Sequence, residues 1–121
     1  MQERGWGRVV AVTSAAVRQP MANLILSNPA RSGLTAFLKT TALEVAGDGV
    51  VVNTVQPGLH ATDRLAQLYD DLDGVAGSVP TGRLGDPGDF GRIVAFLCSE
   101  SARSIIGASI PVDSGAVKGL Q

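Results

Sequence analysis

The chain has 121 residues, a formal net charge of −1 and 45% hydrophobic residues, which suits one domain with a modest core. This balance leaves no basic excess for nucleic acid or an anionic membrane surface. No apolar run reaches membrane-spanning length, and the first residues lack the apolar core of a signal peptide. The single cysteine, Cys98, lies in an apolar helical pattern and is predicted to be a small core residue. We therefore expect a soluble cytoplasmic protein without an internal disulfide or a metal site.

The predicted elements alternate between strands and helices. Strands are expected at residues 8–13, 50–56 and 107–112, and the two main helices at 29–46 and 87–99. The middle strand is a near-continuous β-branched run, typical of a parallel strand covered by helices on both faces. Right-handed crossovers place consecutive strands parallel and side by side. The predicted fold class is α/β, the C-terminal part of a doubly wound parallel sheet with three parallel strands and two main helices.

Both main helices show a start signal. Asn28 is the predicted cap of the first, with Pro29 at its first helical position, and Asp86 and Pro87 play these parts in the second. Each helix has one apolar stripe that is predicted to be buried: Leu34, Phe37, Leu38, Thr41 and Val45 in the first, and Phe90, Ile93, Val94 and Leu97 in the second.

The stretch after the middle strand is the first place to look for a ligand site. Pro57 and Gly58 end that strand, and ligands of doubly wound sheets bind outside the carboxyl ends of the strands. Thr62 is predicted to cap a short helix that carries Leu65, Leu68, Tyr69 and Leu72 on one side. Residues 73–82 are expected to form an irregular loop, and residues 60–85 either a substrate lid or a merely mobile surface loop. No Gly-rich phosphate-binding turn follows any of the strands.

Five segments occur in an order that points to a family: GRVVAVTS (7–14), LSNPAR (26–31), VVNTVQPG (51–58), GRLGDP (82–87) and PVDSG (111–115). Together they resemble the C-terminal half of a short-chain dehydrogenase/reductase, nearest the 3-oxoacyl-acyl-carrier-protein reductase-like members. The resemblance covers nearly the whole chain. It implies that residues 1–121 form a partial Rossmann-like domain and take part in carbonyl reduction or alcohol oxidation with NAD or NADP, on a small-molecule substrate.

The resemblance assigns the catalytic positions to residues that depart from the family pattern. Ser14 matches the serine that hydrogen-bonds the substrate oxygen, although a local capping role is the alternative. Leu24 stands at the position of the tyrosine acid and Asn28 at that of the lysine, so neither a proton nor a charge that lowers a neighbouring pKa is supplied. His60 could replace the acid because its ordinary pKa suits proton transfer, whereas a solvated loop histidine is the alternative. Tyr69 is the weaker substitute, since its apolar surroundings indicate packing.

The cofactor positions lie after the middle strand. By resemblance, Pro57, Gly58 and Leu59 form the segment whose backbone meets the nicotinamide carboxamide. Thr62 matches a residue near the pyrophosphate, or is a plain helix cap. Tight binding of NAD or NADP by this chain alone is not expected, because the Gly-rich turn is missing.

Two functions remain open. The chain is either an oxidoreductase module that works only with a missing N-terminal half, or a non-catalytic remnant that acts as an oligomerisation or assembly module. The apolar strand at 8–13 would lie at an open sheet edge, and such edges pair with other chains. A homo-oligomer, or pairing with the missing half, is therefore predicted. The substrate and the preference for NAD or NADP are not predicted.

Overall fold

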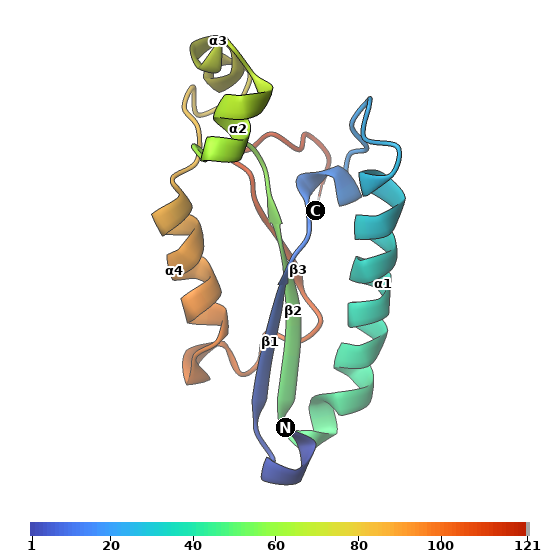
Figure 1. Ribbon diagram of the computed structural model, residues 1–121. Helices are drawn as coiled ribbons and strands as arrows, with labels where there is room; N and C mark the ends of the chain where they lie inside the picture. Colours follow the sequence, from blue (N-terminus) through green and yellow to red (C-terminus); the bar gives the residue numbers. More distant parts are fainter. Residues whose placement is uncertain (121) are drawn as a thin grey trace.

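The computed structural model describes residues 1–120, and its centre is a three-stranded parallel sheet (Figure 1). The strands β1 (Gly7–Val12), β2 (Val50–Pro57) and β3 (Ser109–Val112) lie in the order β1-β2-β3. Gly7 lies opposite Val50 in the first pair, and Thr54 opposite Ser109 in the second. The prediction of an α/β fold with three parallel strands in this order is confirmed.

Two long helices cover the opposite faces of the sheet (Figure 1). Helix α1 (Ser27–Val45) lies on one face and α4 (Pro87–Leu97) on the other. Two short helices, α2 (Asp63–Leu68) and α3 (Leu72–Gly77), lie beyond the carboxyl end of β2. Residues 1–120 also contain four 3₁₀ turns: η1 (Gln2–Arg4), η2 (Ala15–Val17), η3 (Ala46–Asp48) and η4 (Glu100–Ala102). No helix among residues 1–120 is both long and apolar enough to cross a membrane.

The core consists of two clusters, one on each side of β2. On the α1 side, Ala42 packs with Val50 and Val52. On the α4 side, Val55 packs with Leu97 and Ala102. Residues 50–56 are all buried, which explains the β-branched run of the middle strand, because both of its faces are covered.

Asn53 is a buried polar residue that ties β2 to the start of β3. Its Nδ2 donates to the carbonyl of Ile105 at 2.6 Å, and its Oδ1 accepts from the N–H of Ala108 at 2.8 Å. Gly107 between them has φ +64°. This turn is why the third strand begins at Ser109 and not at 107.

The two edges of the sheet differ in how their backbone groups are protected. Gly7 and Thr13 donate towards β2, so the alternation of a parallel ladder directs the N–H and C=O groups of Arg8, Val10 and Val12 to the unpaired side. On that side Arg31 donates to the Val12 carbonyl at 2.9 Å. The β1 edge is otherwise left open by the described residues.

The β3 edge carries more protection. Ala108 and Val112 accept from β2, so Ser109 and Pro111 have their backbone groups on the outer side. Arg18 donates to the Ser109 carbonyl at 3.1 Å, and Pro111 has no N–H to offer. Strand β1 is therefore the edge at which another strand can add.

The start and the buried face of α1 differ from the prediction. The helix begins at Ser27, with Leu26 as its cap residue, so the assignment of Asn28 as the cap is wrong. Of the predicted stripe, Leu38 and Val45 pack on the core, but Phe37 is 65% exposed and Leu34 is exposed as well. Ala42 takes their place, because a small side chain lets the helix approach Val50 and Val52 closely.

Helix α4 follows the prediction more closely. Asp86 is its cap and accepts from the N–H of Asp89 at 2.8 Å, and Pro87 is at the first position. The predicted stripe packs in the core cluster on this side. Cys98, however, follows the last helical residue and is exposed, so its prediction as a core residue is wrong.

The segment after Thr62 is more ordered than predicted. Thr62 caps α2, as expected, but this helix ends at Leu68, and Leu72 begins the separate helix α3. Asp71 caps α3 by accepting from the N–H of Gly74 at 2.9 Å, so the irregular loop predicted for 73–82 is wrong over its first half. Tyr69 is 45% exposed, which contradicts its predicted packing.

Candidate functional site at the carboxyl edge of the sheet

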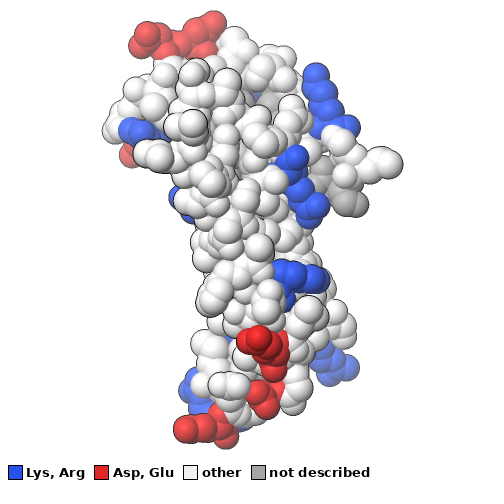
Figure 2. All heavy atoms as spheres, turned by 90° about the vertical axis from the view of Figure 1, so that its right-hand side faces the viewer, with Lys and Arg blue, Asp and Glu red and all other residues white. Residues whose placement is uncertain are grey.

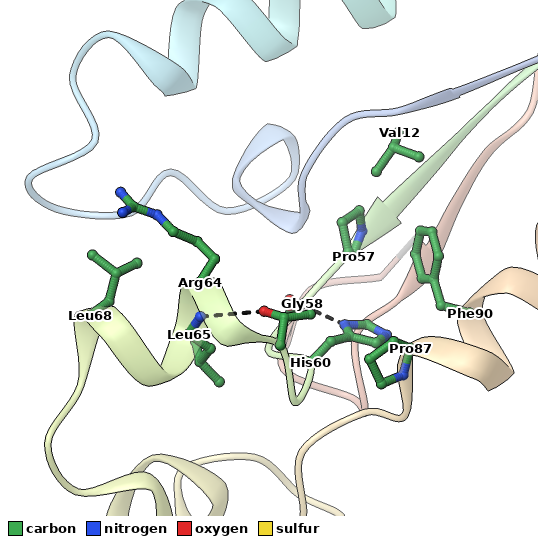
Figure 3. A pocket seen from close by; sticks show the side chains of 10 residues that line it. Val12, Pro57, Gly58, His60, Arg64, Leu65, Leu68, Pro87 and Phe90 are labelled. Atoms are coloured by element: carbon green, nitrogen blue, oxygen red, sulfur yellow. Dashed lines mark hydrogen bonds between the residues drawn. The ribbon is translucent and has the colours of Figure 1, made fainter.

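An apolar cavity of about 330 Å³ lies at the carboxyl ends of β1 and β2. Its walls come from four elements, as can be followed in Figure 3: Val12 and Pro57 end β1 and β2, Leu65 and Leu68 belong to α2, and Phe90 belongs to α4. The alternation along β1 places Val12 and Val10 on the same face, and Val10 packs on the α4 side. The cavity therefore opens on the α4 side of the sheet.

The turn at Pro57 and Gly58 is fixed by close contact with the end of β3. The N–H of Gly58 donates to the Val112 carbonyl at 3.1 Å. A Cβ at Gly58 would lie 2.7 Å from the Cα of Asp113. Glycine is required here because the two backbones approach so closely.

Leu59 has one free backbone group and one engaged backbone group. Its carbonyl accepts from the N–H of Gly85 at 2.9 Å, and its own N–H donates to no group of the described residues. The carbonyl keeps a second lone pair. An amide ligand could therefore both accept from and donate to this residue.

His60 is part of a contact between the segment after β2 and the segment before α4. Its ring meets Phe90 edge-on, with centroids 5.1 Å apart, and a Cβ at Gly85 would lie 2.7 Å from the ring. Its Nδ1 lies 3.4 Å from the Gly58 carbonyl, as drawn in Figure 3. The residue is half-buried, and its ring is packed on Phe90.

Thr62 and Ser14 both cap local backbone through their oxygen atoms. The Thr62 hydroxyl accepts from the N–H of Leu65 at 3.3 Å, and the Ser14 hydroxyl accepts from the N–H of Ala16 at 3.1 Å. Neither hydroxyl donates a hydrogen bond within the described residues. Each therefore keeps its proton for an acceptor on a ligand.

Asn28 has an orphaned acceptor near the start of α1. Its Nδ2 donates to the Met21 carbonyl at 2.9 Å, and its Oδ1 is buried without a partner among the described residues. Leu24 lies one turn earlier, where its carbonyl accepts from the N–H of Asn28 at 2.9 Å. Leu24 is partly exposed and offers no group for proton transfer.

The structure brings only some of the predicted site residues together. Pro57, Gly58, His60 and Thr62 line the same cavity, whereas Ser14, Leu24 and Asn28 belong to the connection between β1 and α1 and do not line it. Sequence reasoning missed Val12, Phe90 and Arg64 as lining residues. The strand alternation at Val12 was a usable signal, but the position of Arg64 depends on how α2 turns back over the sheet.

No group of three or more His, Cys, Asp or Glu side chains among residues 1–120 is placed to hold a metal ion. The cavity walls are apolar apart from His60, Thr62 and Arg64. The chemistry available at this edge is therefore hydrogen bonding by backbone and hydroxyl groups beside an apolar surface.

Comparison with known proteins decides the family. Residues 1–117 match the family described as enoyl-(acyl carrier protein) reductase. The chain belongs to the short-chain dehydrogenase/reductase family. Acetoacetyl-CoA reductase of Cupriavidus necator is 37% identical over 116 residues, which are 95% of this chain and 47% of that protein. A 3-oxoacyl-[acyl-carrier-protein] reductase of Vibrio harveyi is 38% identical, with 95% and 48% covered.

Solved structures of related reductases have the same fold over the length of this chain. The L-sorbose reductase from Gluconobacter frateurii, complexed with NADPH and L-sorbose, aligns with a TM-score of 0.91 and 32% identity over 99% of this chain and 51% of that one. A variant of actinorhodin polyketide ketoreductase with NADPH aligns with a TM-score of 0.92 and 28% identity, covering 98% and 50%. The chain thus spans about half the length of the short-chain dehydrogenases/reductases that it matches.

Proposed function

We propose that this chain is the C-terminal half of an NAD(P)-dependent reductase for small carbonyl compounds, active only together with a half that carries the Gly-rich turn. The observation that carries the proposal is the apolar cavity beside the Pro57–Gly58 turn. It lies outside the carboxyl ends of parallel strands, where α/β sheets bind their ligands. The family supplies the reaction class, and the NADPH in two related structures supports the cofactor.

The residues present fit the nicotinamide end of such a cofactor. The free N–H of Leu59 can donate to the carboxamide oxygen, and its carbonyl can accept from the carboxamide nitrogen. The orphaned Oδ1 of Asn28 is an acceptor for a ribose hydroxyl. Val12, Pro57 and Phe90 give the cavity apolar walls against which a nicotinamide ring can pack.

The reaction needs a hydride and a proton from different sources. A reduced nicotinamide bound here would provide the hydride for the carbonyl carbon, as the NADPH in two related structures suggests. In this chain the Ser14 hydroxyl is free to hydrogen-bond the substrate oxygen, but Leu24 has no proton to deliver to it. His60 lines the cavity and is the remaining titratable candidate, although its ring also packs on Phe90. Protonation of the substrate oxygen is therefore the step for which this chain is least well equipped.

A hybrid protein tests the proposal. The chain is joined to the N-terminal half of the acetoacetyl-CoA reductase, and NADPH binding and acetoacetyl-CoA reduction are measured. The double variant Leu24→Tyr/Asn28→Lys restores the family's acid and cation, so its kcat/KM should rise by about 10²-fold or more. The matched control is Leu26→Tyr/Asn28→Lys, because Leu26 is exposed just two residues away.

Two results would contradict the proposal. In the first, the folded hybrid fails to bind NADPH. In the second, it binds NADPH but the restored pair gains no more activity than the control pair. A simpler observation also bears on it: DNA upstream of this coding sequence should encode, in frame, a βαβ half with a Gly-rich turn.

The second candidate function is an assembly module without catalysis. The observation that favours it is the outer face of α1, where Phe37 is 65% and Leu43 is 67% exposed. Leu24 and Asn28 also replace the tyrosine and lysine of the catalytic positions. Both observations suit a chain that associates through α1 but does not catalyse a reaction. A hybrid that binds no cofactor but still associates through α1 would favour this function.

A further inference from the structure

A second cavity, of about 430 Å³, lies on the α1 side of the sheet, away from the apolar cavity at the carboxyl edge. It is bounded by α1, by the 3₁₀ turn η2 and by the β3 edge. On α1 its lining residues are Ser32, Thr35, Ala36 and Lys39, which recur at the spacing of one helix face. The four positions show that a continuous strip of α1 faces this cavity.

Two cations from different elements line this cavity, and each donates to a carbonyl at the start of β3 or in the turn just before it. Arg18 donates from Nη2 to the Ser109 carbonyl at 3.1 Å, and Lys39 donates from Nζ to the Gly107 carbonyl at 3.0 Å. A Cβ at Gly107 would lie 3.0 Å from the Lys39 side chain, so the ammonium group lies tightly over that glycine. Both side chains are therefore positioned before any ligand arrives.

Neither cation has an acidic partner. The two ion pairs among residues 1–120 are Arg8 with Glu100 and Arg92 with Asp89, and the cavity lining contains no Asp or Glu. In Figure 2 the face that carries α1 shows Lys and Arg side chains along its middle, while the acidic groups lie towards its upper and lower ends. The cavity thus has an uncompensated positive charge.

Gln56 adds an unsatisfied donor to the same cavity. It is 0% exposed, its Oε1 accepts from the Nε of Arg18 at 3.1 Å, and its Nε2 is buried without an acceptor among the described residues. A buried donor without a partner is costly. The arrangement supplies donors in excess and lacks acceptors.

We propose that this cavity binds the phosphate group of a small phosphorylated molecule, held by Arg18 and Lys39. Of the five N–H groups of an arginine, Arg18 uses two, and Lys39 uses one of three. With the Ser32 hydroxyl, more donors remain than a carboxylate can accept, whereas a phosphate accepts on three terminal oxygens. The cavity also leaves room for the organic part of the ligand beside Val17 and Ala36.

The test uses phenyl phosphate, with benzoate as the carboxylate of similar size and sodium chloride as the ionic-strength control. Binding is measured by calorimetry, and the site is mapped by backbone amide NMR shifts. We expect saturable binding of phenyl phosphate, stronger than that of benzoate, with shifts concentrated at Ser32, Gly107 and Ser109.

Three variants sharpen the test. Lys39→Gln removes one cation and Gln56→Glu places a negative charge beside Arg18, so each should weaken phenyl phosphate binding about tenfold or more. Arg103→Gln is the matched control, because Arg103 is exposed after η4 and does not line the cavity. Its affinity should change by less than about twofold.

The proposal is overturned if phenyl phosphate shows no saturable binding, if benzoate binds as tightly, or if Arg103→Gln loses as much affinity as the two site variants. The shift map on the unaltered chain decides the location even where a variant does not fold. Shifts confined to the carboxyl-edge cavity would place the anion there and contradict this assignment.

Discussion

At Gly58 the backbone that follows β2 contacts the backbone at the end of β3. The Gly58 N–H donates to the Val112 carbonyl, and a Cβ on Gly58 would lie 2.7 to 2.9 Å from the Cα, Cβ and carbonyl oxygen of Asp113. Asp113 is itself held by its carboxylate, which accepts from the N–H groups of Gly115 and Val117 at 3.0 and 2.8 Å. Neither partner can move freely, so the turn beside the cavity is rigid.

Gly58→Ala should therefore destabilise the protein by about 1–3 kcal/mol, the usual cost of overpacking. The measurement is urea unfolding followed by circular dichroism. Gly33→Ala in α1 is the control, since a Cβ there meets nothing within 4 Å, and it should stabilise the helix by about 0.5–1 kcal/mol. If Gly58→Ala were as stable as the native chain, the close contact with Asp113 would be wrong.

For single residues, the sequence predicted hydrogen bonds to near neighbours in the chain better than contacts with distant segments. Thr62 and Asp86 were identified as caps because a cap depends on neighbours a few residues away. Cys98 and Asn28 were misplaced, since the exposure of one and the partner of the other depend on segments that the local pattern does not contain. The carbonyl of Met21 that binds Asn28 is one such partner.

At the scale of elements, α4 and the segment around His60 form one unit. Asp86 caps α4, and Phe90 in its first turn contacts the His60 ring. The backbone adds a bridge between His60 and Gly85. Fraying of the start of α4 should thus loosen the segment after β2 as well.

Asp86→Ala should cost about 1 kcal/mol of stability, and Asp86→Asn only a few tenths, because asparagine keeps the capping oxygen. Hydrogen exchange at the amides of Ala61 and Gly85, which bond to carbonyls across this contact, should speed up in the alanine variant. Unchanged exchange in a destabilised Asp86→Ala protein would mean that α4 and the His60 segment are not coupled.

The helices also show where periodicity stops being informative. In α4 one stripe is apolar and is the face that packs. In α1 the predicted stripe is only partly buried, because Leu34 and Phe37 belong to it and are exposed. The buried face of α1 is the one that carries Ala42, which packs on Val50 and Val52. This fit of a small side chain against branched ones depends on the assembled sheet and cannot be seen in the helix sequence.

At the scale of the whole molecule, the unequal sheet edges predict how copies associate. Arg8, Val10 and Val12 direct backbone groups to the open side of β1, and the described residues cover only the Val12 carbonyl. We expect a dimer or larger species by sedimentation at micromolar concentration. A stable monomer would count against this expectation.

Val12→Pro tests the edge itself. Proline removes an outward N–H without breaking the ladder to β2, so association should weaken by about tenfold or more while the fold is kept. Val12→Thr keeps the N–H and serves as the control. Equal association of the two variants would move the interface away from β1, for example to the exposed face of α1.

We propose that this chain provides only the nicotinamide end of a dinucleotide site. The direct measurement is a titration of NADPH, and separately NADH, into the purified chain, followed by cofactor fluorescence and by turnover of a ketoester. Most polar contacts to the cofactor phosphates need a Gly-rich turn at a helix N-terminus, and Leu24 supplies no proton. We expect no saturable binding at micromolar cofactor and no turnover above background. A micromolar dissociation constant, or clear ketoester reduction by the chain alone, would contradict it.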